Sequence, residues 1–325
     1  MKRILVYSVF AVALLLTGCS KDRLKIDLST VERSPRIQHF DLAFYDTDST
    51  GFLNGDLQVL RSDYPLFFMS GTDTFWQERR EDPTQYRLYT DLVKVFGDYS
   101  GMDGKMEKIL KHLYYYYPSH SLESVQTYIS NLDYGFPIVY ADSVVFIASD
   151  LFLGGTHPGY RHMADYQKFQ RQARFLPSAF SEAVITPMVK KNPKDVTLLA
   201  DMIYWGQVYY GMRALNPELE EKLLMRYSVD EMTFCETHEK EMWTYFIDQE
   251  YLFSSEFDLK RRFIETAPFS KFGVPDDYQS PGAIGKWVGY KIVSSYMEEH
   301  PEVTVQELLA KTNATEIFKN SKYKP

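Results

Sequence analysis

The residue with the clearest chemistry is Cys19, which closes the motif Leu16-Thr17-Gly18-Cys19. Small residues before a cysteine allow a signal peptidase to seat the chain, and the thiol can then accept a diacylglyceryl group with acyl chains such as palmitate. Lys2 and Arg3 precede an almost wholly apolar run over residues 4–16, which has the length of a signal-peptide core and is too short to span a bilayer. The pattern predicts lipidation at Cys19; the alternative is an ordinary cleaved signal followed by a chance cysteine.

The lipidation motif divides the chain into three predicted parts. Residues 1–18 form a lipoprotein signal peptide, residues 19–36 a polar lipidated tether, and residues 37–325 a single globular, mostly helical domain. No other stretch has a transmembrane pattern, so acyl chains on Cys19 are the expected membrane anchor.

Other reactive side chains do not form a recognised catalytic or metal-binding motif. Two groups contain histidines at a spacing that could ligate a metal. The first is the pair His157 and His162; the second consists of Glu236, His238, Glu239 and Glu241. A hydrogen-bonding loop and a solvated helix face are the favoured interpretations of these groups. The sequence contains no His-Glu-x-x-His, Cys-x-x-Cys or Gly-x-Ser-x-Gly motif. We therefore expect no metal site, no cofactor and no catalytic residue.

One helical segment, residues 198–210, has the shape of the zinc-binding helix of gluzincin-like peptidases. Tyr204, Trp205 and Val208 stand where such a helix carries its two histidines and its glutamate. None of these three side chains can ligate zinc or act as a carboxylate base. If the fold is related, the three positions mark the remnant of a cleft whose catalytic site is lost.

Composition limits the class of protein. The 325-residue chain has a formal net charge of −8, and an acidic body repels phosphate backbones, so nucleic-acid binding is not expected. With Cys19 lipidated, Cys235 is the one cysteine left, and an intramolecular disulfide is excluded. The 25 tyrosines and 22 phenylalanines predict a large aromatic core, with a recognition surface as the alternative.

Helical patterns outnumber strand patterns. Residues 37–45 alternate and predict a strand, and residues 138–140 and 144–148 flank a polar turn and predict a hairpin. Helices are predicted over 53–65, 83–96, 102–117, 196–215, 218–227, 230–252, 258–264, 285–300 and 305–319. The expected fold class is α+β, predominantly α-helical with one small antiparallel β-sheet; a degenerate zincin-like peptidase fold is one candidate.

The C-terminal third contains glycines and aromatic residues with readable packing roles. Gly282, Gly285 and Gly289 allow close helix packing or a tight turn, and Trp287 and Tyr290 are expected in the core. The apolar loop over residues 267–272 is expected to close the core, with ligand binding as the alternative.

Several stretches are specific enough to compare with a protein family. They are Ile138-Val139-Tyr140-Ala141-Asp142-Ser143-Val144, Leu153-Gly154-Gly155-Thr156-His157-Pro158, Met202-Ile203-Tyr204 with Gly206, Trp243-Thr244-Tyr245-Phe246-Ile247, Ala267-Pro268-Phe269-Ser270-Lys271-Phe272, the run 280–293 and the run 316–325. Together they resemble the gliding motility lipoprotein GldB family of Bacteroidota over most of residues 35–325.

The resemblance implies a cell-envelope lipoprotein of the gliding motility apparatus, which works beside the secretion machinery that shares its parts. It implies a role in envelope assembly where a relative does not glide, and it brings no catalytic residue. This sequence departs from the family pattern at Trp205, where glutamate is frequent, and this departure moves it further from a peptidase.

The predicted function is therefore a non-enzymatic scaffold or assembly factor. Its expected partners are the membrane, through Cys19, and motility or secretion proteins of the envelope. Surface lipoproteins of Bacteroidota commonly carry an acidic cluster after the lipidated cysteine, whereas Ser20-Lys21-Asp22-Arg23 is mixed, which favours a periplasm-facing position on the cell membrane or outer membrane. The alternatives are a glycan- or peptide-binding lipoprotein, motivated by the tyrosines, and a metallopeptidase relative, motivated by the helix over 198–210.

Overall fold

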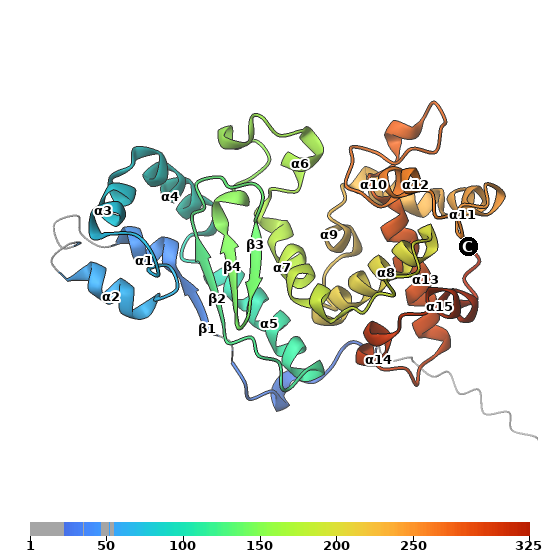
Figure 1. Ribbon diagram of the computed structural model, residues 1–325, viewed down its shortest axis with the longest axis horizontal. Coiled ribbons are helices and arrows are strands. Elements are labelled where there is room, and N and C mark those ends of the chain that lie inside the picture. Colours follow the sequence, from blue (N-terminus) through green and yellow to red (C-terminus); the bar gives the residue numbers. More distant parts are fainter. Residues whose placement is uncertain (1–22, 35, 47–51, 53–54) are drawn as a thin grey trace, which may run out of the picture.

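A four-stranded sheet lies toward one side of a mainly helical molecule in the computed structural model (Figure 1). The structure describes residues 23–34, 36–46, 52 and 55–325, so Cys19 and the predicted signal peptide lie outside the described residues. The strands are β1 (Arg36–His39), β2 (Ser124–Tyr128), β3 (Ile138–Ala141) and β4 (Val144–Ala148). Their order in the sheet is β1-β2-β4-β3. The predicted α+β class, with helix predominating, is confirmed.

The sheet is mixed, which corrects the prediction of an antiparallel one. β3 and β4 form the predicted antiparallel hairpin, with Tyr140 paired to Val145. β1 and β4 both run parallel to the central strand β2, whose largely polar sequence gave no strand signal. Parallel neighbours need a long crossover, and the helical segment between β1 and β2 provides one.

The predicted strand over residues 37–45 ends at His39, where helix α1 (Phe40–Asp46) begins. Phe40 and Phe44 lie four residues apart, so the alternating apolar positions also fit one face of a helix. Both rings are buried, with their centroids 5.3 Å apart. Packing of this face against the core selects the helix.

The other helices surround the sheet and extend away from it. They are α2 (Asp56–Asp63), α3 (Asp73–Glu81), α4 (Pro83–Phe96), α5 (Ser100–Tyr116), α6 (Asp165–Phe169), α7 (Leu176–Ile185), α8 (Leu198–Leu215), α9 (Glu221–Met225), α10 (Val229–Thr237), α11 (Glu239–Asp248), α12 (Phe257–Phe263), α13 (Ile284–Glu299), α14 (Val305–Ala310) and α15 (Ala314–Ser321). Helices α5 and α7 lie between the sheet and α8 (Figure 1). The helix predicted over 230–252 is broken at His238 into α10 and α11. The apolar pattern did not reveal this break, because a one-residue interruption leaves the spacing of apolar residues nearly unchanged.

Helices α8 and α13 cross with their backbones almost in contact. A Cβ atom added to Gly206 would lie 2.2 Å from the carbonyl oxygen of Gly289, and one added to Gly289 would lie 1.8 Å from that of Met202. Trp287 is fully buried and Tyr290 nearly so. The predicted roles of Gly289 in close helix packing and of both aromatic residues in the core are confirmed.

The part of the predicted tether that the structure describes lies along the body. The Arg23 guanidinium donates hydrogen bonds to three carbonyl oxygens at and just beyond the C-terminal end of α13, which belong to Met297, His300 and Val303. Leu24 is buried in the core. The chain is therefore fixed to the body from Arg23 onward, four residues after Cys19.

A buried carboxyl group, Asp41, lies where β1 and β2 end. Its side chain accepts hydrogen bonds from the hydroxyls of Tyr99 and Thr127, both 2.7 Å long. The His39 ring contacts Thr127 Oγ1 through Nδ1 at 3.1 Å and stacks on Tyr99. Burial raises the pKa of Asp41, against the opposing effect of the two hydroxyl hydrogen bonds and of His39. The network ties the ends of these strands to Tyr99 at the start of α5.

Asp41→Asn is expected to remove a pH dependence of stability. Because the folded state raises the pKa of Asp41, this group stabilises the protein fully below its unfolded pKa of about 3.8 and loses that contribution as pH rises through the folded value. The unfolding free energy of wild type relative to Asp41→Asn should therefore fall as pH rises above 4. Urea unfolding of both proteins between pH 3.5 and 7 measures this difference, and a difference that is constant with pH contradicts the prediction.

Candidate functional site

The three positions predicted to mark a remnant cleft lie on α8 in different surroundings. Tyr204 and Trp205 are half-buried and in ring contact, with centroids 5.6 Å apart, and Tyr204 borders a cavity of only about 10 Å³. Val208 has no exposed surface. Among the described residues, no three histidine, cysteine or carboxylate side chains are grouped to hold a metal ion. At these positions α8 contributes mainly to packing.

The histidines singled out in the sequence are engaged in hydrogen bonds or helix ends. His157 Nε2 lies 3.3 Å from the carboxylate of Asp91, and His162 accepts a hydrogen bond from Arg161. His238 forms the junction between α10 and α11. His157 and His162 thus make the hydrogen bonds expected of loop histidines, whereas His238 lies at a helix junction.

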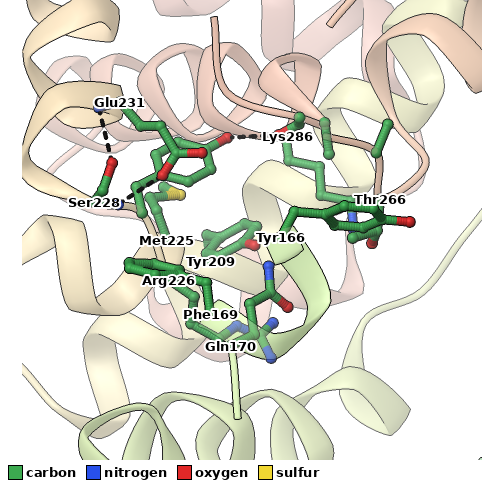
Figure 2. Close-up of a pocket in the computed structure, with 14 residues that line it drawn as sticks. Tyr166, Phe169, Gln170, Tyr209, Met225, Arg226, Ser228, Glu231, Thr266 and Lys286 are labelled. Carbon is green, nitrogen blue, oxygen red and sulfur yellow. Dashed lines mark hydrogen bonds between the residues drawn. The ribbon is translucent and has the colours of Figure 1, made fainter. Parts of the chain in front are cut away.

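A larger pocket, of about 270 Å³, lies where α6, α8, α9 and the first turn of α13 meet. We call it the Lys286 pocket; its wall includes Tyr166, Phe169, Tyr209, Arg226, Gly282 and Lys286. Figure 2 shows Tyr166 and Thr266 on one side, Met225 and Arg226 on the other, and Tyr209 between them. The pocket joins residues that are far apart in the chain, from Tyr166 to Lys286.

One wall of the pocket is a loop held by two buried serines. Ser270 Oγ donates to the carbonyl oxygen of Pro281 at 2.7 Å and accepts from the backbone N–H of Ile284 at 3.1 Å. Ser280 Oγ accepts from the backbone N–H of Ser270. Gly282 fits this wall because a Cβ atom there would lie 1.9 Å from the carbonyl oxygen of Ala267. The two serines thus position the start of α13.

An ion pair lies against the opposite wall. The Arg226 guanidinium pairs with the carboxylate of Glu182 on α7, and the two side chains are 19% and 22% exposed. Arg226 and Ala283, which both line the pocket, have left-handed backbone conformations with φ of 58° and 57°. Arg226 ends α9 as its left-handed C-cap, a common way for a helix to end, and Ala283 stands directly before α13. Burial raises the pKa of Tyr209, beside this pair, to about 12, so its hydroxyl remains protonated.

Lys286 lies in the first turn of α13 with its ammonium nitrogen 3.6 Å from the ring centroid of Trp205. A cation over an indole face is attracted by the ring quadrupole. Burial lowers the pKa of Lys286 to about 8; Glu182 opposes this effect and Arg226 adds to it. Trp205, one of the predicted cleft residues, therefore supports the pocket from beneath Lys286.

Sequence reasoning identified the loop that forms one wall but not the charged residues. The available signal for Lys286 was its position as a lone charge in the apolar run from Ala283 to Tyr290. Glu182, Tyr209 and Arg226 lie in ordinary helical patterns and gave no comparable signal.

Comparison with known proteins gives one match. The family model for the gliding motility protein GldB matches residues 21–325, nearly the whole chain. Neither a search of curated proteins nor a search of solved structures found a match. None of the described helices has the length and apolarity needed to cross a bilayer. The match extends from the residues just after Cys19 to the C-terminal residue, and the chain therefore belongs to the family of the gliding motility protein GldB.

Proposed function

We propose that this protein is a lipid-anchored scaffold or assembly factor of the gliding motility apparatus in the cell envelope, and that it works with the linked secretion machinery. The observation that carries the proposal is the family match over residues 21–325. The lipidation motif ending at Cys19 supports a membrane anchor. The mixed charge of residues 20–23 supports a position facing the periplasm.

The role proposed is non-enzymatic. On α8, tyrosine, tryptophan and valine stand where a zinc peptidase of this shape would carry its ligands and base, and Val208 is fully buried. The loop with Ser270 and Ser280 is used in backbone hydrogen bonds. These residues support a protein that acts by binding its partners.

Cys19→Ala tests the anchor and the motility role together. Without a thiol at this position no diacylglyceryl group can be attached, so the variant should move from the membrane fraction to the soluble fraction. In a strain that lacks the gene, wild-type protein should restore colony spreading and the Cys19→Ala variant should not. Cell fractionation, colony spreading and the amount of secreted protein are measured in the same strains.

Cys235→Ala is the matched control, because Cys235 is the other cysteine and is buried in α10. This variant should stay in the membrane fraction and support spreading.

Surface labelling tests the proposed orientation. An amine reagent that does not cross membranes should leave a periplasm-facing protein unlabelled in intact cells. Unchanged spreading and secretion in the deletion strain would be incompatible with the proposed role.

A further inference from the structure

The Lys286 pocket holds a positive charge that no neighbouring carboxylate neutralises directly. Among the described residues, Lys286 forms no salt bridge, and its ammonium nitrogen lies 3.6 Å from the centroid of the neutral Trp205 ring. A cation that is partly removed from water without a counter-ion is unfavourable. The lowered pKa of Lys286 reflects this cost.

The second cation of the pocket, Arg226, is already paired. Its guanidinium lies against the Glu182 carboxylate, so one positive and one negative charge offset each other there. Glu231 accepts a hydrogen bond from the backbone N–H of Ser228 at the start of α10, away from Lys286 (Figure 2). Of the two cations that line the pocket, Lys286 is therefore the one without a carboxylate partner among the described residues, and its charge can attract an anionic ligand.

The rest of the pocket wall suits a small ligand with an apolar face. Tyr166, Phe169 and Tyr209 contribute aromatic rings, while Gln170 and Thr266 contribute polar groups. The volume of about 270 Å³ is near the lower end for small-molecule pockets and fits one amino-acid or sugar residue. The pocket thus combines one cation with rings that can pack on a compact ligand.

We propose that the Lys286 pocket binds a small organic oxyanion, a carboxylate or phosphate carried on a body the size of one amino-acid or sugar residue. The Lys286 ammonium is the counter-ion, and the rings of Tyr166 and Tyr209 pack on the body of the ligand. The ion pair of Arg226 with Glu182 fixes the opposite wall. This proposal can be tested separately from the motility role, because ligand binding is measured on the purified protein.

Calorimetric titration of the detergent-solubilised mature protein tests the proposal with matched probes. N-acetylglycine is compared with N-acetylglycinamide, and glucuronate and glucose 6-phosphate are compared with glucose. Acetate and inorganic phosphate are the free ions. At least one acidic organic probe should bind about tenfold or more tightly than its neutral partner, the effect of a charge-assisted hydrogen bond. Comparing glucuronate with glucose 6-phosphate distinguishes a carboxylate from a phosphate ligand.

Lys286→Met keeps the aliphatic stem but removes the charge, and it should abolish the preference for the acidic probe. Lys291→Met is the control on the same helix, and it should retain the preference because Lys291 lies outside the pocket, 3.9 Å from Glu239. In wild type, the bound acid should also slow acylation of the Lys286 amine, measured by mass spectrometry, without slowing that of Lys291.

Three results overturn the proposal. The first is equal affinity for the acidic and neutral probes, and the second is an unchanged preference for the acidic probe in Lys286→Met. The third is that folded protein, shown by cooperative unfolding, binds either the free ions alone or none of the probes. The acylation measurement uses unaltered protein, so the proposal stays testable if Lys286→Met does not fold. A failure of these tests leaves the Cys19 experiments unaffected.

Discussion

Gly289→Ala should lower the free energy of unfolding by about 3 kcal/mol or more, the upper range for overpacking a core. The added Cβ atom would lie 1.8 Å from the carbonyl oxygen and 2.5 Å from the carbonyl carbon of Met202. Both are backbone atoms inside α8, so no side-chain rotation can relieve the overlap. The two helices must separate, and the loss extends to the side chains packed along both of them. Chemical denaturation of the purified protein measures the change.

Gly104→Ala is the matched control for this substitution. Gly104 lies within α5, and a Cβ atom there would meet nothing within 4 Å. Because alanine loses less conformational entropy than glycine on forming a helix, this variant should gain about 0.5–1 kcal/mol of stability. If Gly289→Ala is as stable as wild type, the close crossing of α8 and α13 does not exist in solution.

Glu182→Ala is expected to destabilise the protein by about 2 kcal/mol. Removing one member of a buried ion pair costs about 3–5 kcal/mol, and the partial exposure of Glu182 and Arg226 reduces that figure. The loss leaves Arg226 unpaired beside Lys286, so two positive charges repel each other in the pocket. The unfolding free energy and the affinity for an acidic probe are both measured on this variant.

Glu107→Ala removes a comparable pair on the surface. Glu107 lies 2.9 Å from Lys111 one turn later on α5, and the two side chains are 44% and 29% exposed. Such a pair contributes about 0.3–0.5 kcal/mol. Equal effects of Glu107→Ala and Glu182→Ala would show that the pocket pair is as solvated as the surface pair.

Much of the helical fold was predictable because apolar residues recur at the helical period along the chain. The same signal fails where two structures share a pattern, as at Phe40 and Phe44, which suit either an alternating strand or one helix face. It also fails where a strand is largely polar. β2 holds the centre of the sheet through backbone hydrogen bonds to β1 and β4, and its Gln126 and Thr127 are buried without being apolar.

The candidate site was predictable only in part, for a different reason. The loop containing Ser270 and Gly282 was identified from its unusual residues, and it does form a wall of the pocket. The pairing of Arg226 with Glu182 joins residues 44 positions apart. Such contacts depend on how α7 and α9 pack, and no local pattern encodes that packing.

The attachment of Arg23 to the end of α13 has a mechanical consequence. The four residues from Cys19 to Arg23 can span at most about 14 Å, so a lipid on Cys19 would keep the body close to the bilayer. Tension between the membrane and a partner would then enter the protein at the C-terminal end of α13, where Arg23 holds three carbonyl oxygens. From there it would pass along the helix to the crossing with α8. A pulling force would therefore strain the core directly, with little slack in a linker to absorb it.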